Sequence, residues 1–276
     1  MKVFKKIREL RENVRVVVHL DDAPFLEIND LSVNLNGNPA LKGISFGLQD
    51  GEQVAVVGPN GAGKSTLFKV IAGVIPATSG QVQLSGHAPG GHICIAYLPQ
   101  RSDVDWDFPA TVRDVVMMGR VRKLGLFRWP KATDWDFVQA CLRLVGMDDL
   151  SHRQIDALSG GQQQRMFIAQ ALAQEAELLL MDEPLGGLDV PSQEEVLRIL
   201  EELRDHHVTV MLATHDLGMA AQRFDRVMLL NTTLEGFGKP EEVFTEELLK
   251  SAYGAHLQTI RTEDGLVLLD DSCCDG

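Results

Sequence analysis

The sequence predicts an α/β protein in which helices cover a mostly parallel β-sheet. Short apolar runs at 53–57, 178–181 and 208–212 fit buried strands, and stretches with helical spacing separate them. Strands that alternate with helices usually pair in parallel through right-handed crossovers. A glycine-rich segment, GPNGAGKST at 58–66, joins the first of these strands to a helix. No internal repeat is present, so the sequence predicts one such domain rather than a tandem pair.

Size and composition limit the possible classes of protein. The chain has 276 residues, of which 45 % are hydrophobic, enough for one sizeable core. Its net charge of −13 disfavours a broad basic surface, so we expect no nucleic-acid partner. The first twelve residues are basic, but the apolar run after them is too short for a signal peptide. No segment approaches the roughly 18 apolar residues of a membrane span, so we expect a soluble protein that is not exported.

We expect three regions along the chain: a charged N-terminal extension (1–23), a main domain (24–257) and an acidic C-terminal tail (258–276). Within the main domain, residues 25–48 alternate and turn, which predicts an N-terminal antiparallel β subdomain. Residues from about 101 to 163 predict an inserted helical subdomain. Further strands are predicted at 81–84, 93–97, 226–230 and 234–237. Helices are predicted at 66–72, 111–118, 136–145, 166–173, 192–204 and 240–249.

The segment at 58–66 fits the phosphate-loop pattern G-x-x-x-x-G-K-[ST]. Its glycines let the backbone N–H groups approach a phosphate chain closely. Lys64 is placed to reach the β- and γ-phosphates, and the Ser65 hydroxyl is placed to ligate Mg²⁺. A simple glycine turn would not need Lys64. The main domain is therefore predicted to have a P-loop NTPase core, with its phosphate contacts from Gly58, Pro59, Asn60, Gly61, Ala62, Gly63, Lys64, Ser65 and Thr66.

Two adjacent carboxylates, Asp182 and Glu183, end the apolar strand at 178–181. A carboxylate at the carboxyl end of such a strand can hold Mg²⁺ beside the Ser65 hydroxyl. The next residue leaves the strand in another direction and can orient a water molecule for in-line attack. An Asp-Glu pair can also form a solvent-exposed acidic turn without a catalytic role. Here the pair follows a buried strand, and this position favours Asp182 as the magnesium ligand and Glu183 as the general base.

The run Leu-Ser-Gly-Gly-Gln at 158–162 precedes another apolar helical segment. Ser159 is a candidate N-cap, and the glycines at 160 and 161 leave the start of the helix bare. A bare helix N-terminus attracts an anion through its N–H groups and dipole. A capped surface helix would have the same serine, so this run indicates an anion-binding site only in combination with the other motifs.

Over roughly residues 25–257, these motifs resemble the nucleotide-binding subunits of ABC transporters. The run at 158–162 is similar to the family's signature motif, Gln100 to its Q-loop glutamine, Asp189 to its D-loop and His215 to its switch histidine. The resemblance implies ATP and Mg²⁺ as cofactors, with Gln100 also near the metal and His215 in the catalytic set. It adds to the nucleotide contacts Ser159, Gly160, Gly161, Gln162 and Asp189.

One position departs from the family pattern. Where the family usually has an aromatic residue that stacks on adenine, this chain has Leu35. Leucine offers only apolar contact with the base, so the preference for ATP over GTP is in question. Phosphate binding does not depend on this position.

The resemblance also implies partners. Two copies would bind ATP head to tail, with Ser159 and Gly161 of one copy meeting the γ-phosphate held by Lys64 of the other. Segments 101–120 and 238–244 are similar to those of manganese, zinc and iron-chelate importers. This predicts integral membrane permease subunits and, indirectly, an external substrate-binding protein as partners, with the chain peripheral on the cytoplasmic face of the membrane. Trp106 and Phe108 either form an aromatic docking surface or pack inside the helical subdomain.

Two other assignments remain open from the sequence. A soluble ATPase of the iron–sulfur assembly type would share the nucleotide chemistry, and so would the nucleotide-binding subunit of an exporter. The four cysteines lack zinc-site spacing. We expect Cys94 and Cys141 to be core residues, and Cys273 and Cys274 to belong to a disordered terminus rather than to a metal or redox sensor.

Overall fold

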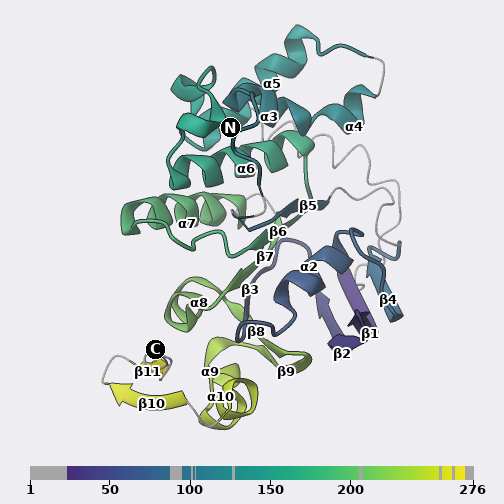
Figure 1. Cartoon of the computed structure of the whole chain (residues 1–276), viewed down its shortest axis with the longest axis vertical. Helices are drawn as coiled ribbons and strands as arrows, with labels where there is room; N and C mark the ends of the chain where they lie inside the picture. Colours follow the sequence, from purple (N-terminus) through teal and green to yellow (C-terminus); the bar gives the residue numbers. More distant parts are fainter. Residues whose placement is uncertain are drawn as a thin grey trace.

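The computed structural model describes residues 24–87, 95–100, 102, 104–125, 128–204, 208–254, 257–262 and 265–270. The extension at 1–23 lies outside these residues, as do Cys94 and the pair Cys273 and Cys274. Figure 1 shows the chain as two β-sheets below a group of helices, with a small hairpin near the C-terminus. Among the described residues, no helix has the length and apolar character needed to cross a membrane.

A six-stranded sheet forms the centre of the molecule. Its strand order is β5-β6-β7-β3-β8-β9, and all neighbours pair in parallel except β8 and β9. This confirms the predicted mostly parallel sheet. The central strands are short apolar runs buried on both faces, as parallel strands between two layers must be. The strands are β3 Gln53–Val57, β5 Ile95–Leu98, β6 Leu178–Asp182, β7 Thr209–Thr214, β8 Arg226–Asn231 and β9 Thr233–Gly238.

Alternate residues of the central strands enter two different cores. Val54 and Val56 pack in one core, while Ala55 and Val57 pack in the other. The same alternation continues in the neighbouring strands, because successive side chains of a strand point to opposite faces. The central sheet therefore contributes side chains to both cores, and each of its faces is covered by a different kind of layer.

One face is covered by an antiparallel sheet and the helix after the glycine-rich loop. The sheet has the order β2-β1-β4, formed by β1 Leu26–Leu35, β2 Asn38–Leu48 and β4 Ser79–Leu84. The turn between β1 and β2 has positive φ at Asn36 (51°) and Gly37 (85°), which suits an Asn-Gly hairpin turn. Helix α2, Lys64–Ile71, packs in the same core. The predicted antiparallel subdomain is confirmed.

The other face is covered by helices, most of them from the central part of the chain (Figure 1). The predicted helices at 111–118 and 136–145 are confirmed as α3 and α5, whereas the short α4 was not predicted. Met166, Val196 and Phe137 are among the side chains that place these helices in one continuous core with the sheet. The helices are α3 Val112–Met118, α4 Val121–Leu124, α5 Ala132–Leu144, η2 Asp148–Leu150, η3 Ile155–Ala157, α6 Gly160–Gln174 and α7 Val190–Arg204.

The C-terminal part differs from the sequence predictions in two ways. The single helix predicted at 240–249 is wrong, because the chain forms α9, Pro240–Val243, and α10, Glu246–Tyr253. Thr245 interrupts the helix by capping α10: its hydroxyl accepts a hydrogen bond from Leu248 N at 3.4 Å. The predicted acidic tail contains an antiparallel hairpin, β10 Leu257–Thr262 and β11 Gly265–Asp270. Helix α8, Leu217–Arg223, was also not predicted.

Candidate nucleotide-binding site

The glycine-rich loop runs from the end of β3 to the start of α2, as predicted. Two of its glycines are required by close backbone contacts. A Cβ on Gly58 would lie 2.0 Å from Leu230 O, and one on Gly63 would lie 2.5 Å from Ala40 O. Gly63 also has a φ of 96°, which side chains rarely tolerate. The loop is therefore fixed against β8 and β2 at both of its ends.

Helix α2 begins directly after this loop. Gly63 is its N-cap and supplies no side-chain hydrogen bond, so the first N–H groups of the helix have no side-chain cap. The loop itself is anchored by Thr232 N, which donates to Ala62 O at 2.9 Å. An anchored loop before an uncapped helix start is a suitable geometry for binding a phosphate group.

Lys64 is buried within the loop, with 6 % of its surface exposed. Its ammonium group donates to Gly58 O at 2.7 Å and to Pro59 O at 3.1 Å. Burial lowers the pKa of Lys64, while the nearby charges of Glu183 and Asp182 oppose that change. The Lys64 ammonium group thus lies against the loop, with two neutral carbonyl groups as its partners. A phosphate oxygen bound at the loop would give it an anionic partner.

Asp182 is the last residue of β6 and is buried, with 3 % of its surface exposed. Tyr97 Oη donates to Asp182 Oδ2 at 3.3 Å, whereas Oδ1 is buried without a hydrogen-bond partner. Burial raises the pKa of Asp182, and hydrogen bonds from Ser65 and Tyr97 oppose that rise. An unpartnered carboxylate oxygen beside a hydroxyl suits a hard cation such as Mg²⁺, which prefers oxygen ligands. The residues present therefore fit a magnesium ion.

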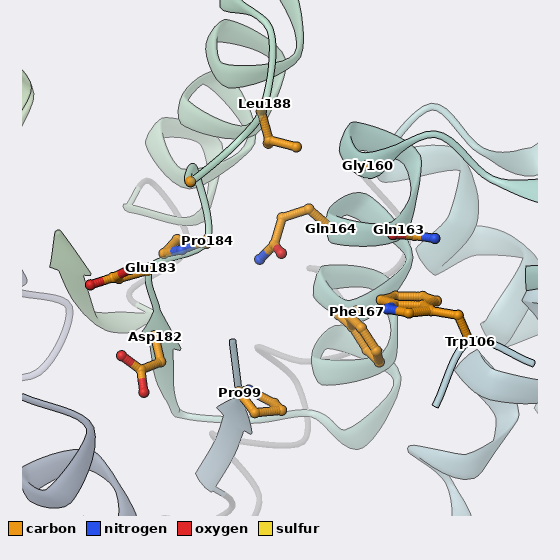
Figure 2. Close-up of a pocket in the computed structure, with 11 residues that line it drawn as sticks. Pro99, Trp106, Gly160, Gln163, Gln164, Phe167, Asp182, Glu183, Pro184 and Leu188 are labelled. Atoms are coloured by element: carbon orange, nitrogen blue, oxygen red, sulfur yellow. The ribbon is translucent and has the colours of Figure 1, made fainter. Parts of the chain in front are cut away.

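Glu183 leaves the strand in a left-handed backbone conformation, with a φ of 48°. Its N–H donates to Ala213 O of β7 at 3.1 Å, which holds the residue at the strand end. Figure 2 shows the carboxylates of Asp182 and Glu183 on the side of the strand end that faces away from α6. Both acidic groups are therefore present in one region, with the metal-binding candidate deeper than the base.

Gln100 and His215 come from the two strands beside β6. Gln100 follows β5, whose Leu98 pairs with Met181, and His215 follows β7, whose Ala213 pairs with Asp182. Parallel strands end at the same edge of a sheet. The structure therefore places the segments that carry Gln100, Asp182, His215 and the glycine-rich loop along one edge of the sheet.

The segment at 158–162 forms the start of α6, which begins at Gly160 rather than at the predicted residue 166. The start is capped on both sides: Ser159 Oγ accepts from Gln162 N at 3.4 Å, and Gln162 Oε1 accepts from Ser159 N at 3.0 Å. The expectation of a bare helix start is thus corrected, because Ser159 and Gln162 form a capping box. Ser159 remains exposed, and Gly160 is half-buried.

Gly161 has a structural role that the motif did not reveal. A Cβ at this position would lie 2.5 Å from Ser192 Oγ in the first turn of α7. The second glycine of the motif therefore permits α6 and α7 to approach each other closely.

A small pocket lies between α6 and the loop that follows Glu183 (Figure 2). Trp106 lines it and packs against Phe167 of α6, with ring centroids 5.5 Å apart and the two rings tilted by 58°. Phe108 is 53 % exposed. The two aromatic residues thus differ: Trp106 packs against the helical core, and Phe108 is at the surface. The pocket residues are Pro99, Trp106, Gly160, Gln163, Gln164, Phe167, Asp182, Glu183, Pro184, Gly186 and Leu188.

Two predicted nucleotide contacts lie at the surface. Leu35 ends β1 next to the hairpin turn and is 42 % exposed. Asp189 is exposed at the start of α7, where its carbonyl accepts from Gln193 N at 3.0 Å. Tyr97 is a site residue that sequence reasoning missed, because no motif in the chain links a tyrosine of β5 to an aspartate of β6.

A glycine-rich loop between β3 and α2, with a buried lysine and a carboxylate at the end of a nearby parallel strand, defines a P-loop nucleotide-binding protein. The family model described as ABC transporter matches residues 41–186. This chain belongs to the ABC transporter family, whose ATPase domain binds ATP.

Several curated proteins resemble the chain over most of their length. The manganese transport system ATP-binding protein MntB of Bacillus subtilis is 42 % identical over 86 % of this chain and 95 % of its own length. The zinc transport system ATP-binding protein TroB of Treponema pallidum is 40 % identical over 85 % and 88 %. The chelated iron transport system membrane protein YfeB of Yersinia pestis is 42 % identical over 90 % of this chain and 85 % of its own length.

Solved structures of ABC transporter chains also resemble this chain. A chain of an ABC transporter described as metal-chelate type, in an inward-facing conformation, matches with a TM-score of 0.78 and 28 % identity. The match covers 91 % of this chain and all of that one. The ADP conformation of the ATP-binding cassette MJ1267 matches at a TM-score of 0.75 and 21 % identity, which supports the fold alone.

Proposed function

We propose that this chain is the ATP-hydrolysing subunit of an ABC importer for metal ions or metal chelates, with manganese, zinc or iron as the cargo. The observation that carries the proposal is the similarity to a manganese transport subunit, 42 % identical over 95 % of its length. Zinc and chelated-iron subunits resemble the chain to nearly the same degree, so the proposal stops at the class of cargo.

In this proposal, residues 58–66 hold the phosphate chain of ATP, and Lys64 neutralises its terminal phosphates. The ammonium group now bonded to two loop carbonyls would exchange them for phosphate oxygens. Glu183 orients and deprotonates the attacking water molecule, and His215 and Gln100 complete the catalytic set from the adjacent strands. Leu35 contacts the base through apolar surface alone.

Mg²⁺ would be held by Ser65, Asp182 and Gln100. When bound, it neutralises charge on the β- and γ-phosphates. The buried Oδ1 of Asp182, which has no protein partner, supports this assignment. Tyr97 keeps the other carboxylate oxygen in place.

A second copy of the chain would complete each nucleotide site. Ser159, Gly160, Gly161, Gln162 and Asp189 of one copy would meet the ATP held by the other, in a head-to-tail dimer. The surface position of Ser159 and Asp189 supports this arrangement, because an interface residue must be accessible before association. Closure around the γ-phosphate and reopening after its hydrolysis would drive the membrane permease subunits.

The localisation that follows is peripheral, on the cytoplasmic face of the membrane, next to permease subunits that receive cargo from an external binding protein. An iron–sulfur assembly ATPase or an exporter subunit would use the same nucleotide chemistry. Reconstitution distinguishes these alternatives: an importer subunit hydrolyses ATP faster when its permease and loaded binding protein are present, and a soluble ATPase does not.

Glu183→Gln tests the catalytic assignment. We expect ATP to bind as in the wild type, hydrolysis to slow about a hundredfold or more, and an ATP-dependent dimer to accumulate. Radiolabelled nucleotide binding, phosphate release and light scattering measure the three effects. Glu241→Gln, an exposed substitution of the same kind in α9, serves as the matched control. Normal turnover by Glu183→Gln would remove Glu183 as the base.

A further inference from the structure

The loop from Pro184 to Asp189 joins the proposed base at one end to the proposed dimer contact at the other. Two glycines weaken its local order: Gly186 and Gly187 are both exposed, and Gly187 has a φ of 69°. Within the loop, Gly186 N donates to Glu183 O at 3.2 Å and Leu188 N donates to Leu185 O at 3.3 Å. Two turn hydrogen bonds give little restraint to a glycine pair at the surface.

Gln193, in the first turn of α7, supplies a second kind of restraint. Its side-chain amide donates to Leu185 O and to Leu188 O, both at 3.2 Å. Its backbone N–H donates to Asp189 O at 3.0 Å. One residue therefore holds three carbonyl groups of the loop from a regular helix, and its side chain spans the glycine pair.

The held loop also faces α6. Leu188 lines the same pocket as Gly160 and Gln164, and Figure 2 shows Leu188 and Gln164 directed toward the space between the loop and the helix. Two further contacts join the helices themselves: Gly161 lies against Ser192, and Arg165 pairs with Glu195 at 3.2 Å. The start of α6 and the start of α7 thus act as one unit within the chain.

We propose that Gln193 is a positioning residue for ATP hydrolysis. It fixes the loop that carries Glu183 and Asp189 at its ends, and it seats that loop against the start of α6, where Ser159 lies. The inference rests on the proposed function, in which these groups serve catalysis and dimer contact. In this proposal Gln193 acts through the loop that it holds, and not by touching the nucleotide.

The test compares Gln193→Met with Gln139→Met in the full chain. Methionine keeps the length of the side chain and removes the amide donors. Gln139 is a matched control, because its amide also donates to a backbone carbonyl, that of Asp148 at 3.4 Å, but within the helical subdomain. Both variants are measured for melting temperature, ATP affinity, kcat and hydrogen–deuterium exchange of the peptide spanning 184–190.

For Gln193→Met we expect kcat to fall about tenfold, the equivalent of one to two lost hydrogen bonds expressed in the transition state. ATP affinity should stay within about twofold of the wild type, since Lys64 and its loop are untouched. Exchange in the 184–190 peptide should be faster than in Gln139→Met. Gln193→Glu, which sets a carboxylate against the two carbonyls, should lower kcat at least as far.

The inference is overturned if Gln193→Met keeps wild-type kcat and exchange, or if its losses only match those of Gln139→Met. It is also overturned if the melting temperature of Gln193→Met falls so far that the loss of folded protein explains the whole loss of kcat. Failure of the proposed function would give a different result from failure of this inference. In that case the wild-type chain itself would bind ATP without Glu183-dependent hydrolysis.

Discussion

Two buried charged side chains, Lys64 and Asp182, have pKa values that move in opposite directions for one reason. Burial disfavours the ionised form of each, so it lowers the pKa of the lysine and raises that of the aspartate. A buried charge with incomplete pairing costs free energy. A ligand with phosphate oxygens at one end and a bound divalent cation would supply both missing partners. The site is therefore suited to a metal–nucleotide complex rather than to a free nucleotide.

Leu35 offers a test of base recognition at the residue scale. Leu35→Trp should tighten ATP binding about fivefold, because stacking on adenine adds about 1 kcal/mol to apolar contact. The exposed position of Leu35 leaves room for the larger ring. Fluorescence titration with ATP and GTP measures the effect.

Val121→Trp is the control for this titration, since Val121 is similarly exposed on α4. It should leave both affinities unchanged. Equal affinities for Leu35→Trp and the wild type would place the base somewhere else.

The candidate site residues can be proposed from the sequence because the residues of each motif lie close together in the chain. The contacts that orient those residues cannot. Tyr97 meets Asp182 across 85 positions, and nothing local to either residue indicates that pairing. The left-handed backbone at Glu183 is likewise set by Ala213 on another strand. Motifs indicate which groups are candidates for the site, whereas the tertiary fold determines how those groups are held.

At the scale of elements, strands were easier to predict than helix ends. A short apolar run such as 208–212 has few structural alternatives once a helix precedes it. The helix predicted at 240–249 failed because its spacing continues through Thr245, whose capping role is visible only in the structure. The hairpin of β10 and β11 lies within the stretch that the sequence predicts as an acidic tail, because its charged residues outweigh two short runs that pair only in the folded chain.

Close helix packing leads to a prediction for α3 and α6. Gly119, the C-cap of α3, lies so near α6 that a Cβ would be 2.4 Å from Gln170 O and 3.0 Å from Gln174 N. Gly119→Ala should destabilise the protein by about 1–3 kcal/mol, because a backbone atom cannot move aside cheaply. Thermal unfolding should show a melting temperature roughly 2–4 °C lower per kcal/mol.

Gly218→Ala is the comparison for this helix contact. Gly218 lies in α8, where the nearest atom to an added Cβ is Asp216 Oδ1 at 3.4 Å. We expect no loss of stability there, since alanine favours a helix over glycine. A stable Gly119→Ala protein would mean that α3 and α6 can separate without cost.

At the scale of the whole molecule, the predicted nucleotide and magnesium contacts fall into two groups. Lys64 and Asp182 are buried at the edge of the central sheet, whereas Ser159 and Asp189 are exposed where α6 and α7 begin. In a head-to-tail dimer, the buried group of one chain and the exposed group of the other would form each site. A chain acting alone would instead have to use both groups on the same ATP.

Mixing two inactive variants separates these arrangements. Lys64→Ala removes the phosphate contact, and Ser159→Asp keeps an N-cap but sets a negative charge against the γ-phosphate. In a head-to-tail dimer of one Lys64→Ala chain and one Ser159→Asp chain, a single site carries both defects and the other carries none. With random pairing, half of the dimers are mixed, and each has one intact site. An equimolar mixture should therefore recover about one quarter of wild-type ATP hydrolysis if the sites act independently.

Phosphate release is measured for each variant alone, for the mixture, and for a double variant mixed with wild type as the control. In that control, each mixed dimer has one defect in each site and should be inactive, so only the wild-type dimers, about one quarter of all dimers, hydrolyse ATP. A mixture no more active than the sum of its components would mean that each chain completes its own site.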